Sequence, residues 1–227
     1  VLPPGGPSGR RAEGERSDMA GGSQRKLYLV RHAESLWNSE RRVQGTCLEV
    51  PLSAVGRAQA TLLGARLRAL AVSAFYSSDA RRAMETAQLA LGDGRQFHVD
   101  PSLRELSLGE WEGRLIADIR RETPEKIETW YRKPSAAAVK GAEDLVSFRT
   151  RAVRAIDRIL ASHGGDDVAV VSHGGFICSY LTWTLGMSVD DLWSFSLPNA
   201  SITTIVIDFK PRLRAFGDTA HLDPPSL

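Results

Sequence analysis

The sequence predicts an α/β fold, a three-layer αβα sandwich around a mostly parallel central sheet. Apolar runs from Leu27 to Val30 and from Val168 to Val171 have the length and composition of strands that are buried on both faces. Segments whose apolar residues recur at helical spacing lie between these runs, and a third run, rich in Ile, Val and Thr, spans Ser201–Phe209. This alternation is typical of a sheet with helices packed on both faces.

The patterned region is expected to form one domain over residues 25–210. The chain has 227 residues, of which 42% are hydrophobic, so it can bury a sizeable core, and no linker interrupts the pattern. Residues 1–24 are dense in Gly, Pro, Ser, Arg and Glu and lack an apolar run. We expect them to be a disordered tail, or sequence upstream of a start at Met19. Residues 211–227 are assigned to a C-terminal tail.

Helices and strands are predicted to alternate after the first strand. Ser53 can cap a helix, Ala71–Tyr76 would form a strand, and Asp79 would cap a helix with Arg82 in its first turn. Residues Gln96–Val99 would add a further strand, and the Ser201–Phe209 run would close the sheet in an antiparallel orientation. The apolar stripes of two helices consist of Val55, Leu62, Leu63, Leu67 and Leu70, and of Leu145, Phe148, Ala152, Ile156 and Ile159.

Both central strands lead directly into a histidine. Arg31 and His32 follow the first run, and His173 with the pair Gly174-Gly175 follows the second. Ligands of α/β sheets bind beyond the carboxyl ends of parallel strands, so we expect the two imidazoles side by side at one sheet edge. Glycine lets backbone N–H groups approach a ligand closely, and such groups at a helix start bind anions. The pattern therefore predicts a phosphate site.

Five motifs follow one another in a fixed order along the chain. They are Arg31–Ser35 with Trp37 and Asn38, Gln44-Gly45 with Pro51–Ser53, Ser77–Ala83, Leu103–Leu106 with Gly109–Gly113, and Ser172–Gly175. Together they resemble the motifs of the histidine phosphatase superfamily, also called the phosphoglycerate-mutase-like family, over about Lys26 to Phe209. The chain departs from that pattern at Ala33, where glycine is usual, by one extra residue before Pro51, and in the loop 141–144.

The resemblance implies three catalytic residues. His32 would attack phosphorus and form a phosphohistidine, which splits one hard displacement into two easier ones. Glu105 would protonate the leaving oxygen and later act as base on water. His173 would stand beside the nucleophile and share in stabilising the charge on the phosphoryl oxygens.

Four further residues are implied to bind the phosphate. Arg31 and Arg82 suit this task because a guanidinium offers a planar fork of donors and stays charged. Gly174 offers a backbone N–H at the start of a helix. Asn38 has two interpretations of equal weight, a donor to a phosphate oxygen or a helix cap.

The resemblance implies a phosphomonoester hydrolase for a small phosphorylated metabolite, without a metal or other cofactor. Two alternatives stay open: a phosphoglycerate mutase that uses the same histidine, and a non-catalytic phosphate-binding module. The Gly109–Gly113 sequence and the short connection after it resemble the phosphatase branch more than the mutases. The basic residues of the segment 115–140 favour a second anionic group on the substrate, or else form a solvated helix face.

Composition argues against other classes of partner. The formal net charge is only +2 and no basic stripe with interleaved aromatic residues occurs, so nucleic acid is not expected. Residues Val168 to Val189 carry no charge, but the Ser-His-Gly-Gly segment within them argues against a membrane span. Two separated cysteines, Cys47 and Cys178, favour a reducing, cytoplasmic setting. No interface pattern stands apart from the core periodicity, so the sequence leaves open whether the protein forms a homodimer.

Overall fold

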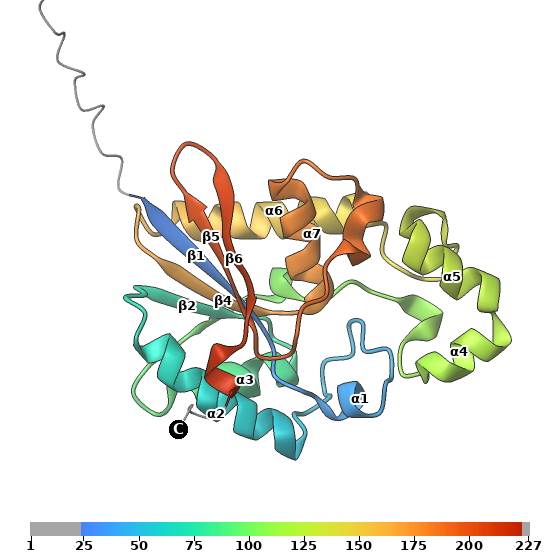
Figure 1. The fold of residues 1–227 in the computed structure, drawn as a ribbon, viewed down its shortest axis with the longest axis horizontal. Helices are drawn as coiled ribbons and strands as arrows, with labels where there is room; N and C mark the ends of the chain where they lie inside the picture. The colour runs from blue at the N-terminus through green and yellow to red at the C-terminus, as the bar shows by residue number, and fades with distance from the viewer. Residues whose placement is uncertain (1–23, 224–227) are drawn as a thin grey trace, which may run out of the picture.

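A mixed six-stranded sheet forms the middle of three layers in the computed structural model, which describes residues 24–223 (Figure 1). The strands are β1 (Arg25–Arg31), β2 (Ala74–Ser77), β3 (His98–Val99), β4 (Val168–Ser172), β5 (Ile202–Ile207) and β6 (Pro211–Asp218). They follow the order β3-β2-β4-β1-β5-β6 across the sheet. The predicted αβα sandwich is confirmed, as are the two buried central strands.

The central strands β1 and β4 run parallel and in register. Leu27 lies opposite Val168, and Arg31 lies opposite Ser172. Just beyond this pair, the backbone N–H of His32 donates to the carbonyl of Ser172 at 2.9 Å. The two histidine-bearing turns therefore leave the sheet at the same edge.

The outer strands correct the predicted domain boundary. Strand β5 is antiparallel to β1, as expected of the closing strand. Strand β6 then pairs antiparallel with β5, so the sheet continues past residue 210, where the sequence placed the start of a tail. This edge strand alternates partly buried and exposed residues, and its apolar positions are too few to indicate a strand. The tail predicted for residues 1–24 lies outside the described residues, except for Gln24.

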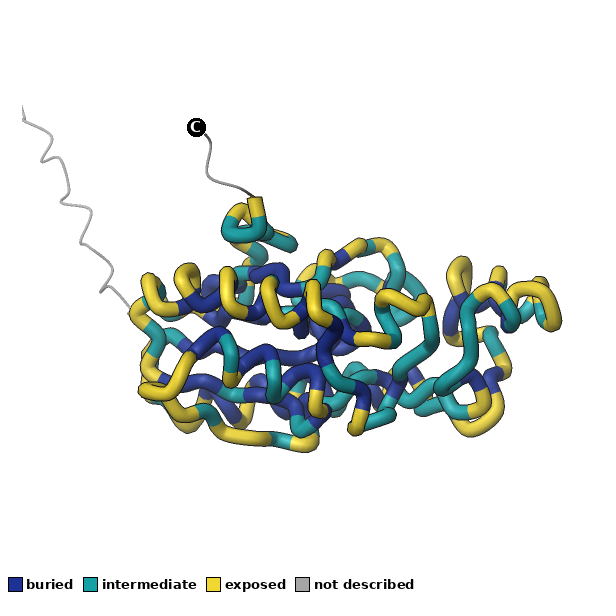
Figure 2. The backbone as a smooth tube through the Cα atoms, turned by 90° about the horizontal axis from the view of Figure 1, so that it is seen from below, coloured by how far each residue is buried: buried dark blue, intermediate teal, exposed yellow. Residues whose placement is uncertain are grey.

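Helices cover both faces of the sheet. The long ones are α2 (Ala54–Arg68), α3 (Arg81–Leu91), α6 (Leu145–Ala161) and α7 (Gly174–Thr184). Alternate residues of β1 point to opposite layers: Tyr28 and Val30 pack in the cluster beneath α2 and α3, and Leu27 and Leu29 pack in the cluster with α6 and α7. Figure 2 shows the buried backbone between the exposed outer helices. The core therefore consists of two apolar layers separated by the sheet.

The helical stripes were predicted correctly for α6 but only in part for α2. All five expected α6 residues are buried. In α2, Leu63 and Leu67 are buried, whereas Val55 is 56% exposed and Leu62 is 49% exposed. The buried face is completed by Gly56, Ala60 and Gly64 instead. A Cβ atom at Gly56 would lie 1.9 Å from the carbonyl oxygen of Glu34, so this close approach of α2 to the loop after β1 requires small residues.

The predicted helix cap at Asp79 is wrong. The N-cap of α3 is Ala80, which forms no side-chain cap. The Asp79 carboxylate instead accepts a hydrogen bond from Nε of Arg104 at 2.8 Å. Arg82 nevertheless lies in the first turn of α3, as predicted, so it faces the carboxyl ends of the strands.

A group of short elements lies beyond the carboxyl ends of the strands, to one side of the sandwich (Figure 1). It consists of α4 (Ile116–Glu122), α5 (Pro124–Arg132) and the 3₁₀ turns η2 (Gly109–Trp111), η3 (Pro134–Ala136) and η4 (Val189–Ser194). The remaining short elements are α1 (Leu36–Ser39), η1 (Pro101–Leu103) and η5 (Ala220–Leu222). Across residues 24–223, none of the helices has both the length and the apolar character to cross a membrane.

Candidate active site

His32 and His173 lie side by side at the sheet edge. Their ring centroids are 5.2 Å apart, with the planes at 62°. His32 is 3% exposed and His173 is fully buried, so both imidazoles are held within the protein rather than on its surface. The structure thus brings together the two histidines that the strand ends predicted.

The ring of His32 is oriented by its own backbone. Its Nδ1 lies 2.8 Å from the carbonyl oxygen of Ala33. Because a carbonyl can only accept, Nδ1 carries the proton and Nε2 of the neutral ring keeps a free lone pair. Burial, together with the charges of Arg82 and Arg31, holds the pKa of His32 well below its usual range. His32 is therefore a neutral ring near neutral pH, held in one orientation with the lone pair of Nε2 free.

His173 is oriented by Ser78, a residue to which the sequence analysis assigned no role. Nε2 of His173 lies 2.9 Å from Oγ of Ser78, which itself accepts the N–H of Ala80 at 3.3 Å. This contact fixes the orientation of the His173 ring. Burial and the charge of Arg82 hold the pKa of His173 well below its usual range. His173 is therefore a buried, neutral ring near neutral pH.

These two buried histidines predict a loss of stability at mildly acidic pH. Below pH 6.5 an unfolded chain protonates both rings while the folded protein does not, so the unfolded state binds more protons and the free energy of unfolding falls as pH falls. Each ring contributes a slope of up to about 1.4 kcal/mol per pH unit in this window. Urea unfolding between pH 7 and pH 5.5 should show that His173→Asn has a shallower dependence than the wild type. An equal slope in both proteins would contradict the prediction.

Arg31 and Arg82 place two cations beside His32. Arg82 is 1% exposed, and its Nη1 and Nη2 donate to the carbonyls of Cys47 at 2.6 Å and Gly45 at 3.0 Å. Burial lowers the pKa of Arg82 to about 10, so the group stays charged near neutral pH. Arg31 donates through Nη1 to the carbonyl of Leu197.

Three buried nitrogens of this cluster lack hydrogen-bond partners within the described part of the chain. They are Nε of Arg31, Nε of Arg82 and Nδ1 of His173. Unpaired buried donors on the two guanidinium groups are costly, and an anion would satisfy them. The geometry therefore favours an anionic ligand next to Nε2 of His32.

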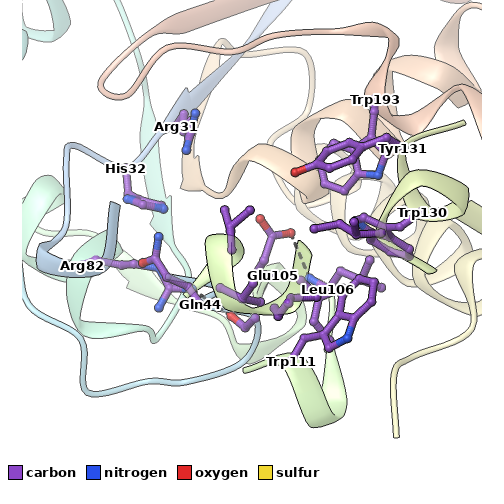
Figure 3. Close-up of a pocket in the computed structure, with 16 residues that line it drawn as sticks. Arg31, His32, Gln44, Arg82, Glu105, Leu106, Trp111, Trp130, Tyr131 and Trp193 are labelled. Atoms are coloured by element: carbon purple, nitrogen blue, oxygen red, sulfur yellow. Dashed lines mark hydrogen bonds between the residues drawn. The ribbon is translucent and has the colours of Figure 1, made fainter. Parts of the chain in front are cut away.

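Glu105 faces this cluster across the pocket (Figure 3). Its carboxylate accepts the backbone N–H groups of Gly175 at 2.9 Å, Phe176 at 3.1 Å and Leu106 at 2.9 Å. A Cβ atom at Gly175 would lie 2.5 Å from Oε1 of Glu105, so only glycine allows this contact. The start of α7 thus holds the carboxylate, and Gly174, the first residue of that helix, lies against the guanidinium of Arg31.

Glu112 and Arg151 are supporting residues that sequence reasoning missed. The Glu112 carboxylate accepts the N–H groups of Thr46 at 3.0 Å and Leu108 at 2.8 Å, which positions the loop whose carbonyls hold Arg82. Arg151 donates to the carbonyls of Arg104 at 2.8 Å and Glu105 at 3.2 Å. Glu112 lies within a matched motif, but nothing in the sequence indicated its partners.

Asn38 does not line the pocket. Its Oδ1 accepts the N–H of Ser35 at 3.1 Å and Nδ2 of Asn199 at 3.2 Å, and it forms a capping box at the start of α1. Of its two interpretations, the structure therefore shows helix capping. Binding of a phosphate oxygen by Asn38 would use its amide nitrogen, Nδ2. That role stays a prediction.

The other wall of the pocket is apolar. It is lined by Val43, Leu106, Leu108, Trp111, Ile116, Ile119, Ile127, Trp130, Tyr131 and Trp193. The basic residues of the segment 115–140 are absent from this lining among the described residues. Arg132, for example, is 79% exposed and pairs with Glu128 at 3.0 Å. This arrangement favours the solvated-face interpretation over a second anion site.

Comparisons with known proteins agree with this fold. A family model described as the histidine phosphatase superfamily, branch 1, matches residues 27–219. A probable phosphoglycerate mutase of Yersinia pestis is 35% identical, over 89% of this chain and 97% of its own. The structure of Bacillus stearothermophilus YhfR matches with a TM-score of 0.81 at 35% identity, covering 87% of this chain and 99% of that one. A mycobacterial glucosyl-3-phosphoglycerate phosphatase matches with a TM-score of 0.76 at 30% identity, covering 85% and 98%.

Proposed function

This chain belongs to the histidine phosphatase superfamily, and from that premise we propose that it hydrolyses phosphomonoesters through a phosphohistidine formed on His32. The observation that carries the proposal is the neutral, buried His32 ring, whose Nδ1 is tied to Ala33 while Nε2 keeps its lone pair. Its neighbours Arg31, Arg82 and His173 each have a buried nitrogen without a hydrogen-bond partner in the described part of the chain. A nucleophile set among fixed anion donors suits phosphoryl transfer.

In the first step, Nε2 of His32 forms a bond to phosphorus as the ester P–O bond breaks. Glu105 donates a proton to the leaving oxygen, so an alcohol departs. Arg31, Arg82 and His173 neutralise the charge that spreads over the equatorial oxygens. The backbone N–H of Gly174, at the start of α7, would add a further donor.

In the second step, Glu105 takes a proton from water, and the oxygen of that water attacks phosphorus. The P–N bond breaks, inorganic phosphate leaves and His32 returns to its neutral form. The scheme uses no metal ion. Covalent catalysis of this kind replaces one difficult displacement by two easier ones.

A phosphoglycerate mutase is the second candidate, because the Yersinia pestis relative carries that name. Such an enzyme returns the phosphoryl group to a sugar acid, whose carboxylate needs a cationic partner. Along the pocket lining that the structure describes, the Lys and Arg side chains are limited to Arg31 and Arg82, which already face the phosphate position. The pocket therefore supports hydrolysis over mutase activity.

Rapid-quench labelling with ³²P-labelled phenyl phosphate tests the mechanism and separates the two activities. We expect an acid-labile, base-stable label on the peptide that contains His32, and release of the label as inorganic phosphate. Steady hydrolysis with a base-labile adduct, or with label on a different peptide, would overturn the mechanism. Faster transfer of the label to added 3-phosphoglycerate than to water would establish the mutase instead.

A further inference from the structure

The wall opposite His32 is built from aromatic rings that pack on one another (Figure 3). Trp111 contacts Trp130 edge to face, with centroids 5.9 Å apart at 90°. Trp130 lies 5.7 Å from Trp193 at 60°, and Tyr131 lies 6.4 Å from Trp193 at 61°. Edge-to-face packing of this kind is favourable and fixes each ring in place. The four residues, named here the aromatic wall, thus form a preorganised surface.

The aromatic wall joins three separate segments. Trp111 belongs to η2, Trp130 and Tyr131 belong to α5, and Trp193 belongs to η4. Aliphatic side chains from α4 and α5, including Ile119 and Ile127, complete the lining beside it. Three segments far apart in the sequence therefore supply one continuous apolar surface next to the catalytic cluster.

The charged side chains of η2, α4, α5 and η4 do not belong to the described lining of the pocket. Arg121 pairs with Asp118 at 2.8 Å, and Arg132 pairs with Glu128 at 3.0 Å, with both arginines mostly exposed. Arg120 and Arg132 line a second hollow, which shares Ile127 and Tyr131 with the pocket of His32. An anionic leaving group would lose its hydration in the pocket without meeting a Lys or Arg side chain of the described lining beyond Arg31 and Arg82, which is costly.

We propose that the alcohol half of the substrate is an uncharged aromatic or other flat apolar group that lies against the aromatic wall. This inference rests on the proposed function and adds the substrate class to it. Phosphate would be held by Arg31 and Arg82, while binding energy and selectivity would come from apolar surface removed from water. Tyr131 is the wall residue best suited to a test, because it is 47% exposed and contributes little to the core.

Three aryl phosphates with leaving groups of similar basicity test the proposal: phenyl phosphate, 2-naphthyl phosphate and 3-carboxyphenyl phosphate. We expect kcat/KM for the naphthyl ester to exceed that for the phenyl ester by at least about tenfold, since the second ring adds several buried carbons. The carboxyphenyl ester should be poorer than the phenyl ester by about tenfold or more. Equal values for all three would overturn the proposal.

Two variants of α5 provide the matched comparison. Tyr131→Ala should lower kcat/KM more for the naphthyl ester than for the phenyl ester, so that the naphthyl advantage falls several-fold. Arg132→Glu, one residue further along the helix, should change neither value. If Arg132→Glu instead lowers kcat/KM for the carboxyphenyl ester alone, the basic residues recognise an anion and the proposal is wrong.

Binding to a His32→Ala variant, measured by calorimetry, separates this inference from the proposed function. Tighter binding of 2-naphthyl phosphate than of phenyl phosphate, together with no turnover by the wild type, would reject hydrolysis and retain the apolar substrate class. Turnover by the wild type with equal binding of the two esters would retain hydrolysis and reject the substrate class.

Discussion

Replacement of His32 by alanine is expected to lower kcat for 2-naphthyl phosphate by about 10⁴-fold or more, as is common when an enzyme loses its nucleophile. The neighbouring imidazole cannot substitute, because Nε2 of His173 is engaged by Ser78 at 2.9 Å. The ³²P label on the protein should disappear together with turnover. Steady-state assays and rapid-quench labelling on the same preparation measure both effects.

The control for this variant is His98→Ala, because His98 is exposed on β3 and does not line the pocket. It should retain the activity of the wild type. Circular dichroism and thermal melting must show that His32→Ala remains folded. A folded His32→Ala protein with more than a few per cent of wild-type turnover would exclude His32 as the nucleophile. A wild type that binds phosphate but releases no alcohol would instead identify the non-catalytic module.

The second large effect is expected for Arg82→Lys. It should lower kcat/KM by about 10²–10³-fold, which is typical for the loss of one preorganised donor to the transition state. A lysine ammonium cannot hold the carbonyls of Gly45 and Cys47 and also present the donor that Nε of Arg82 offers. The loss should fall mainly on kcat, because Arg82 is expected to stabilise the charge of the transition state more than the charge of the bound substrate.

The adjacent residue offers a matched control. Arg81 lies in the same turn of α3, is half exposed, and pairs with Glu85 at 2.8 Å. Arg81→Lys keeps that charge and should retain wild-type kcat/KM. A similar loss of kcat/KM in both variants would indicate a general effect on α3. An Arg82→Lys enzyme with wild-type kcat/KM would show that the planar guanidinium of Arg82 is not needed.

Several parts of the site follow from local sequence patterns. A strand that ends in histidine places the imidazole at the sheet edge, so His32 and His173 were predicted together from two short segments. Arg82 was placed correctly although the cap expected at Asp79 was wrong. The position of Arg82 depends on the start of the helix after β2, and not on which side chain caps it.

Other parts of the site and of the fold could not be predicted, because they depend on contacts between segments that are far apart in the sequence. Ser78 orients His173 across 95 residues, and Arg151 holds the carbonyl of Glu105 across 46 residues. The buried face of α2 was predicted from its large apolar residues, yet Gly56 and Gly64 form much of it because the helix approaches the neighbouring backbone closely. Strand β6 was missed because an edge strand with one covered face needs few apolar residues.

The sequence by itself determined the α/β class, the positions of the central strands, and the histidines and arginine that stand at their ends. These features follow from hydrophobic periodicity and strand direction, which act over a few residues at a time. Only the tertiary structure decided the orientation of the two imidazoles, the three unpaired nitrogens of the cluster, and the aromatic wall. Those depend on which distant segments pack together, and the packing of Trp130 on Trp111 and Trp193 leaves no periodic signal in the chain.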